Sequence, residues 1–128
     1  MRRALIAAVL VAAAVVLFVM GRSAAAEPIE VTTTGTRYAA TVLVPEPGTE
    51  RVTVEIHLRS GDPDTVAVSS VMADMGHATP EITAKETAPG RFAAEGELFP
   101  MSGVWELSVR LDGPAGEEVL TVKALVGG

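Results

Sequence analysis

Apolar and polar side chains alternate through most of the chain after residue 27, and this pattern restricts the folds open to it. In the segment Arg51–Arg59 the apolar positions are Val52, Val54, Ile56 and Leu58. A period of two places such side chains on one face of a β-strand and their polar neighbours on the other. Trp105–Leu111 repeats the pattern. Both segments are therefore predicted to be strands with one buried face.

Weaker patterns predict further strands in the rest of the chain. The segments are Ile29–Thr33, Tyr38–Val44, Thr65–Val71, Ile82–Thr87, Arg91–Glu97 and Val119–Val126. Turn-forming residues, as in Pro45–Gly48 and Asp112–Gly116, recur at intervals of about 8–12 residues. No stretch after Met20 has the 3.6-residue period of a helix. The sequence therefore predicts an all-β fold, an immunoglobulin-like sandwich of seven to eight strands.

The first 26 residues have the composition of a targeting segment. A short basic start, Met1–Arg3, precedes Ala4–Met20, a run of 17 residues without a polar side chain, and Ala24–Ala26 provides the small residues of a cleavage site. Because 17 apolar residues reach the lower limit for crossing a bilayer, residues 1–26 are expected to be either a signal peptide or a membrane anchor. Both interpretations make residues 27–128 an extracytoplasmic domain that is periplasmic, secreted, or anchored to the outer face of the cytoplasmic membrane.

Charge and composition exclude several classes of function. The chain has 10 basic and 16 acidic side chains, and residues 1–26 contain three of the arginines and no acid, so residues 27–128 have a formal net charge of −9. Nucleic-acid binding needs clustered Lys and Arg, so we expect no nucleic-acid partner. We expect membrane contact only through an uncleaved N-terminal segment. The absence of cysteine excludes disulfides, thiolate metal sites and a cysteine nucleophile.

No arrangement of residues predicts catalysis. The acids form no recognisable catalytic pair, and Ser69–Ser70 lacks the sequence that surrounds a nucleophilic serine. The chain has two histidines, of which His57 lies on the polar face of Arg51–Arg59 and is expected to be solvated. We therefore expect no enzymatic activity.

Soft metal-binding side chains gather in two short segments at the ends of predicted strands. Met72, Met75 and His77 lie within six residues, and Met101 lies in Phe99–Gly103. Thioether sulfur favours Cu(I), and imidazole binds copper or zinc. A thioether has no proton to lose, whereas an imidazole must be neutral to bind, so acid should weaken such a site. These four residues are the candidate ligands of a copper ion, as Cu(I).

The same residues also have a purely structural interpretation. Methionine fills gaps in protein cores, and Met72 continues the inward positions of Val66 and Val68. Met72 and Met101 would then pack against Trp105. The domain would be a metal-free interaction module that docks to a membrane-protein assembly. Sulfurs deep in the core favour this interpretation, and sulfurs at a rim beside the histidine favour copper.

Three longer motifs surround the candidate ligands. Met72–His77 has the pattern Met-x-x-Met-Gly-His, Pro89–Gly96 begins with a Pro-Gly turn before an aromatic residue, and Phe99–Trp105 has the pattern Phe-x-Met-x-Gly-x-Trp. Together they resemble the YtkA-like family of small bacterial extracytoplasmic β-sandwich domains, related in style to the FixH group. The resemblance covers roughly Val52 to Val109.

The resemblance implies that residues 27–128 are a YtkA-like β-sandwich domain that handles copper. It implies delivery of Cu(I) during assembly of a respiratory oxidase, with another copper protein or an oxidase subunit as the partner. Matched residue by residue, it assigns the metal-ligand positions to Met72, Met75, His77 and Met101.

Overall fold

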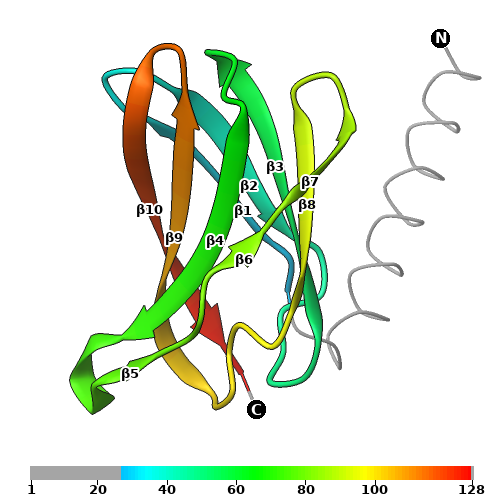
Figure 1. Cartoon of the computed structure of the whole chain (residues 1–128). Helices are drawn as coiled ribbons and strands as arrows, with labels where there is room; N and C mark the ends of the chain where they lie inside the picture. The colour runs from blue at the N-terminus through cyan, green and yellow to red at the C-terminus, as the bar shows by residue number, and fades with distance from the viewer. Residues whose placement is uncertain (1–26, 128) are drawn as a thin grey trace, which may run out of the picture.

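Two antiparallel sheets pack face to face in the computed structural model, which describes residues 27–127 (Figure 1). The first sheet has the strand order β1-β2-β3-β8-β7 and contains β1 (Ile29–Thr34), β2 (Ala39–Val44), β3 (Val52–Ser60), β7 (Lys85–Ala88) and β8 (Arg91–Gly96). The second has the order β10-β9-β4-β5, with β6 also paired to β4, and contains β4 (Thr65–Met72), β5 (His77–Ala78), β6 (Ile82–Thr83), β9 (Gly103–Gly113) and β10 (Gly116–Val126). The predicted all-β sandwich is confirmed.

The signal peptide or anchor predicted at residues 1–26 lies outside the described residues. Within residues 27–127 the helical content is one short 3-10 helix, η1 (Ala73–Met75). No helix in this part of the chain has the length and hydropathy needed to cross a bilayer.

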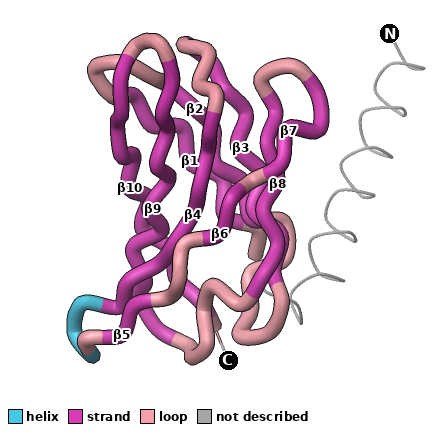
Figure 2. The backbone as a smooth tube through the Cα atoms, viewed as in Figure 1, coloured by secondary structure: helices cyan, strands magenta, loops and turns pink. Residues whose placement is uncertain are grey.

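The described residues form ten strands where the sequence predicts seven or eight. All eight predicted segments contain strands, and β5 is an additional strand of two residues. The predicted segment Ile82–Thr87 divides, because β6 pairs with β4 in the second sheet whereas β7 pairs with β8 in the first. Buried Ala84 lies at this crossing, shown in Figure 2 as a short loop, and its N–H donates to the Val66 carbonyl at 2.8 Å.

The core lies between the two sheets and contains the side chains that the period of two predicted. Residues fully or almost fully buried include Val52, Val54, Ile56, Trp105, Leu107, Val109 and Leu111. Leu58, near the end of β3, is half-buried. The rings of Phe99 and Trp105 pack edge to face with centroids 6.1 Å apart. Trp105 therefore anchors the core where β9 begins.

Glu118 secures the end of the sandwich at which β9 turns into β10. Its carboxylate accepts hydrogen bonds from the hydroxyl of Thr36 and from the backbone N–H groups of Thr36, Arg37 and Tyr38, at 2.6–3.1 Å. The bond from the Thr36 hydroxyl, together with the three backbone bonds, lowers the pKa of Glu118 to about 2. The Tyr38 hydroxyl also donates to the Gly116 carbonyl at 2.8 Å. The turn between β1 and β2 is thereby tied to β10.

We expect Glu118→Gln to lower the thermal midpoint of unfolding at pH 7, because an amide offers one acceptor oxygen to donors that contact two. The folded-state pKa lies below the ordinary value of 4.5, so the stabilisation from Glu118 is complete above about pH 4.5 and is lost as the pH falls towards 2. Thermal unfolding followed by circular dichroism should therefore show a difference at pH 7 that shrinks at pH 2. Glu117→Gln, at the exposed neighbouring position, is the control, and equal effects of the two substitutions would contradict this role.

Candidate metal site

Both segments that contain candidate ligands lie at one end of the sandwich (Figure 1). β4 ends at Met72 and continues through η1 into β5, while the loop between β8 and β9 contains Met101. The β4–β9 pairing brings these segments together, since its last register pair is Val71 opposite Glu106, three residues after β9 begins. All four candidate ligands are therefore at the same end of the molecule.

A tight hairpin presents Met75 and His77. Met75 ends η1, and Gly76 follows with a φ of 67°, a left-handed conformation that glycine adopts without steric cost. β5 then pairs with β4 so that His77 stands directly opposite Met72. Directly opposed residues of an antiparallel pair project from the same side of a sheet. The imidazole therefore emerges on the side from which the Met72 side chain projects.

The four candidate ligands differ in exposure. Met75 is 61% exposed, Met101 is 36% exposed, and His77 is exposed, whereas Met72 is only 5% exposed. The Met72 methyl group packs against Gly103, where an added Cβ atom would lie 2.6 Å from it. Met72 is thus a core residue beneath the start of β9, as the structural interpretation expects. Met75 and Met101, by contrast, are exposed residues.

Ser70 ties together the two segments that contain the candidate ligands. Its side chain is fully buried, and its hydroxyl donates to the Leu98 carbonyl in the loop between β8 and β9. Thr79, which follows β5, binds the same serine: its hydroxyl accepts from the Ser70 N–H at 2.9 Å, and its own N–H donates to the Ser70 carbonyl at 2.9 Å. One buried residue of β4 therefore fixes both the hairpin and the loop.

Trp105 fixes the backbone of the Met101 turn. The indole N–H donates to the Met101 carbonyl at 2.9 Å. The structural interpretation placed Met101 against Trp105, and the hydrogen bond between them involves the Met101 backbone. The Met101 sulfur is thus carried by a turn whose position is set from the core.

The residues that position the site were not identified from the sequence. Leu98 and Thr79 have no distinguishing pattern, and their bonds to Ser70 connect residues 28 and 9 positions apart. The available signal was Ser70 itself, a polar residue on the inward face of β4 between buried Val68 and Met72. A buried hydroxyl needs a hydrogen-bond partner, so such a position indicates a tie to another segment.

An ion pair secures the chain that leads away from the hairpin. Arg110 of β9 donates to both carboxylate oxygens of Glu81, at 2.6 and 2.8 Å. The hydrogen bonds from this guanidinium hold the pKa of Glu81 below its ordinary value. The segment between β5 and β6 is therefore attached to the second sheet.

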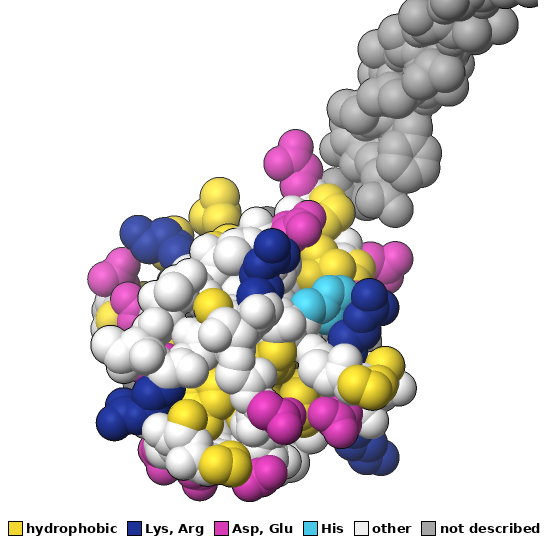
Figure 3. Space-filling model, turned by 90° about the horizontal axis from the view of Figure 1, so that it is seen from above, with side chains coloured by type: hydrophobic (Ala, Val, Ile, Leu, Met, Phe, Trp, Pro, Cys, Tyr) yellow, Lys and Arg dark blue, Asp and Glu magenta, His cyan; other side chains and the backbone are white. Residues whose placement is uncertain are grey.

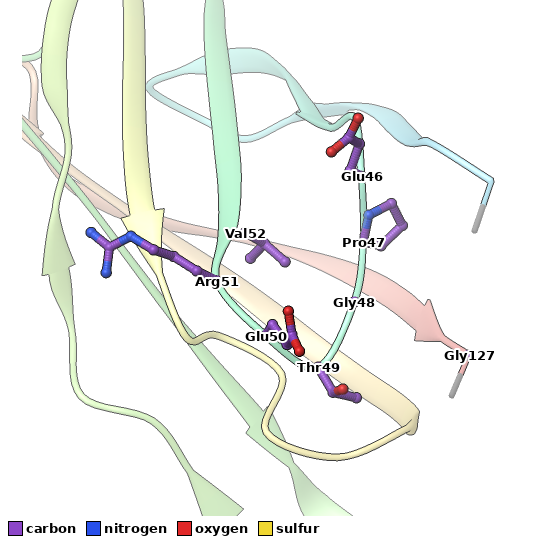
Figure 4. A pocket seen from close by; sticks show the side chains of 8 residues that line it. All are labelled: Glu46, Pro47, Gly48, Thr49, Glu50, Arg51, Val52 and Gly127. Carbon is purple, nitrogen blue, oxygen red and sulfur yellow. The ribbon is translucent and has the colours of Figure 1, made fainter. Parts of the chain in front are cut away.

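Other parts of the described chain lack a comparable set of soft donors. Within residues 27–127 no three His, Asp or Glu side chains are placed to share a metal ion. His57 is half-buried, with its Nε2 4.0 Å from Glu55 Oε1. A surface hollow of about 370 Å³ is lined by residues 46–52 and Gly127, without methionine or histidine (Figure 4). Figure 4 also shows the Arg51 side chain turned away from this loop, where it binds Glu95 of β8.

Comparisons with known proteins give a likeness of fold. The structure is similar to a copper-bound variant of FetP from uropathogenic Escherichia coli strain F11, with a TM-score of 0.56 and 11% identity, over 79% of this chain and 92% of that one. It is also similar to a Br derivative of BhCBM56, with a TM-score of 0.49 and 15% identity, over 73% of this chain and 97% of that one. The sequence matches no family model and no curated protein. Membership of the YtkA-like family therefore stays a prediction.

We expect Ser70→Ala to lower the free energy of unfolding by about 1–3 kcal/mol, because it removes the Ser70 hydroxyl that donates to the Leu98 carbonyl and lies 3.1 Å from the Thr79 hydroxyl oxygen. Amide hydrogen exchange should also accelerate near these two residues. Ser69→Ala changes the neighbouring, half-buried serine on the opposite face of β4 and should stay within about 0.5 kcal/mol. Urea denaturation measures both effects, and equal values for the two variants would show that Ser70 does not hold the segments together.

Proposed function

We propose that this chain is an extracytoplasmic copper-binding protein that takes up Cu(I) and passes it to another copper protein or to an oxidase subunit. In this proposal Met75, His77 and Met101 hold the ion, and the protein catalyses no reaction. The proposal rests on one observation: Ser70 connects the hairpin that contains Met75 and His77 to the loop that contains Met101. The role in respiratory oxidase assembly rests on the resemblance to the YtkA-like family.

The chemistry of the donors supports Cu(I). Thioether sulfur is a soft, neutral ligand that selects Cu(I), whereas Mg²⁺ and Ca²⁺ take oxygen ligands. Imidazole suits copper as well. The buried Met72 is not needed for this set, because its side chain fills the space beneath Gly103.

The exposure of the donors supports transfer of the ion. Met75 and Met101 are accessible, so a ligand from a partner protein can approach while the remaining donors still hold the metal. A thioether is released without taking up a proton, so its replacement needs no change of protonation. The net charge of −9 on residues 27–128 supports a partner with a basic contact face.

The fold likeness supports the same class of function. FetP, at a TM-score of 0.56, is a protein of similar fold that was obtained with copper bound. At 11% identity this likeness concerns the fold, so the proposed ligands rest on the residues of this chain.

We expect residues 27–128 to bind one Cu(I) ion in competition with a chromophoric Cu(I) chelator. This fragment contains every described strand and the core between the two sheets, so we expect it to fold on its own. Affinity should fall by more than about tenfold in Met75→Leu, His77→Ala and Met101→Leu, since losing a ligand should cost at least as much as the roughly 10–100-fold loss from an outer-shell partner. Leucine preserves the side-chain volume, so the fold should change little.

Two substitutions serve as matched controls for the titration. His57→Ala removes the second histidine of residues 27–128, which lies away from the site, and Met72→Leu conserves the packing of the core. Both variants should bind like the parent. Loss of binding in Met72→Leu would instead add this sulfur to the ligands. Unchanged affinity in both His77→Ala and Met101→Leu would reject the copper site and leave a metal-free docking module.

A further inference from the structure

Large exposed apolar side chains are concentrated at one end of the part of the chain that the structure describes. The set is Val31, Met75, Met101, Val104, Val119 and Leu125. All except Val119 lie at or next to the end that holds η1, β5 and the loop between β8 and β9. We call these five residues the apolar end.

The centre of the apolar end is a pair of residues on the outer face of the second sheet. Leu125 of β10 stands directly opposite Val104 of β9, and they are 72% and 48% exposed. In β9, Val104 lies two residues before Glu106, and Glu106 pairs with Val71 of β4. The position across from Val104 on this side therefore falls just after Met72, where η1 begins. Met75 and Met101, on the hairpin and the loop, are further exposed apolar residues at the same end of the sandwich.

The start of the described chain borders this surface. A hollow of about 520 Å³ lies between β1 and β10 and is lined by residues 27–31, Lys123, Leu125 and Gly127. Glu27 and Leu125 thus share one hollow. Residues 1–26 consequently join the domain at the apolar end.

We propose that the apolar end rests on the lipid bilayer that holds residues 1–26 as an anchor. The apolar run Ala4–Met20 has 17 residues, and the six residues 21–26 connect it to Glu27. Six residues span at most roughly 20 Å, so the anchor keeps this end close to the membrane. A short tether gives a high effective concentration, and weak apolar contacts are then sufficient for docking. The sequence predicted membrane contact through the N-terminal segment alone, and the domain adds a second contact.

The charges at this end select a zwitterionic lipid surface. Glu27 and Glu30 line the hollow together with Lys123, and Glu106 stands opposite Lys123 in the row next to Val104. Carboxylates are repelled by anionic headgroups and tolerate neutral ones. The opposite end, seen from above in Figure 3, has Lys, Arg, Asp and Glu side chains around its rim. The apolar end also has exposed carboxylates at Glu46, Glu50, Asp74 and Glu97, so a neutral lipid surface suits it better than an anionic one.

Docking in this orientation turns Met75, His77 and Met101 towards the membrane. A copper acceptor would then be a membrane-embedded protein or one held at the bilayer surface. This corollary rests on the proposed function, whereas the docking itself requires no metal.

The test uses the full chain reconstituted into phosphatidylcholine vesicles. Because the chain has no cysteine, Leu125→Cys and Val119→Cys each give a single attachment point for an environment-sensitive dye. Both positions are exposed on the outer face of β10, six residues and roughly 20 Å apart. We expect the dye at position 125 to emit at shorter wavelength and to be quenched by nitroxide-labelled lipid at least about twofold more than the dye at position 119.

Equal quenching at the two positions overturns the proposal, as does failure of the chain to float with the vesicles. The dye at position 125 could instead shift its emission with the protein-to-lipid ratio and not be quenched by the lipid. That result would overturn the proposal, because it would show that the apolar end contacts a second copy of this chain. Replacing a third of the lipid by phosphatidylglycerol should weaken the quenching at position 125, and stronger quenching would contradict the charge argument. None of these measurements involves copper, so their failure is distinct from a failure of Cu(I) binding.

Discussion

The geometry of the methionine and histidine end depends on the buried hydroxyl of Ser70. A polar group removed from water costs free energy unless it is hydrogen-bonded, so Ser70 and the Leu98 carbonyl are stable in the core only when they meet. Their meeting fixes the loop that carries Met101, while Thr79 fixes the return of the hairpin that carries Met75. Ser70 thereby determines, through its hydroxyl and its backbone groups, where two segments distant in sequence lie. Met75 is 61% exposed and Met101 36%, so the placement of both depends in part on this buried network.

Different chemistry holds the two ends of the sandwich. At the end with the candidate ligands the ties are neutral hydrogen bonds from Ser70 and Trp105, which have no titratable partner. At the other end the carboxylate of Glu118 gathers the turn between β1 and β2, and its contribution depends on its remaining ionised. Protonation of Glu118, whose pKa is about 2, therefore weakens the tie at that end, whereas the bonds of Ser70 and Trp105 do not titrate.

The sequence was informative where one face of a strand is buried over many residues. The alternation in β3 and β9 identified both strands and their inward side chains, because a period of two has a direct structural meaning. β5 and β6 have two residues each, too few for a period, so the crossing of the chain near Ala84 could not be read. The spacing of methionine and histidine located the candidate ligands. Met72 is buried because it occupies one of the alternate positions of β4 that face the core. The partners of Ser70 and Glu118 lie up to 82 residues away, and no local pattern predicts such pairs.

The acidic charge and the exposed apolar side chains both affect which surfaces the domain can contact. Exposed apolar side chains on a freely diffusing domain favour self-association when they form a large patch. The net charge of −9 on residues 27–128 opposes the approach of a second copy, since like charges repel when the two domains meet. The same charge does not oppose contact with a zwitterionic bilayer or with a basic partner face. Leu125 and Val104 lie at the same end of the sandwich as the candidate ligands, and the negative charge of the domain favours neutral or basic contacts there over a second acidic copy.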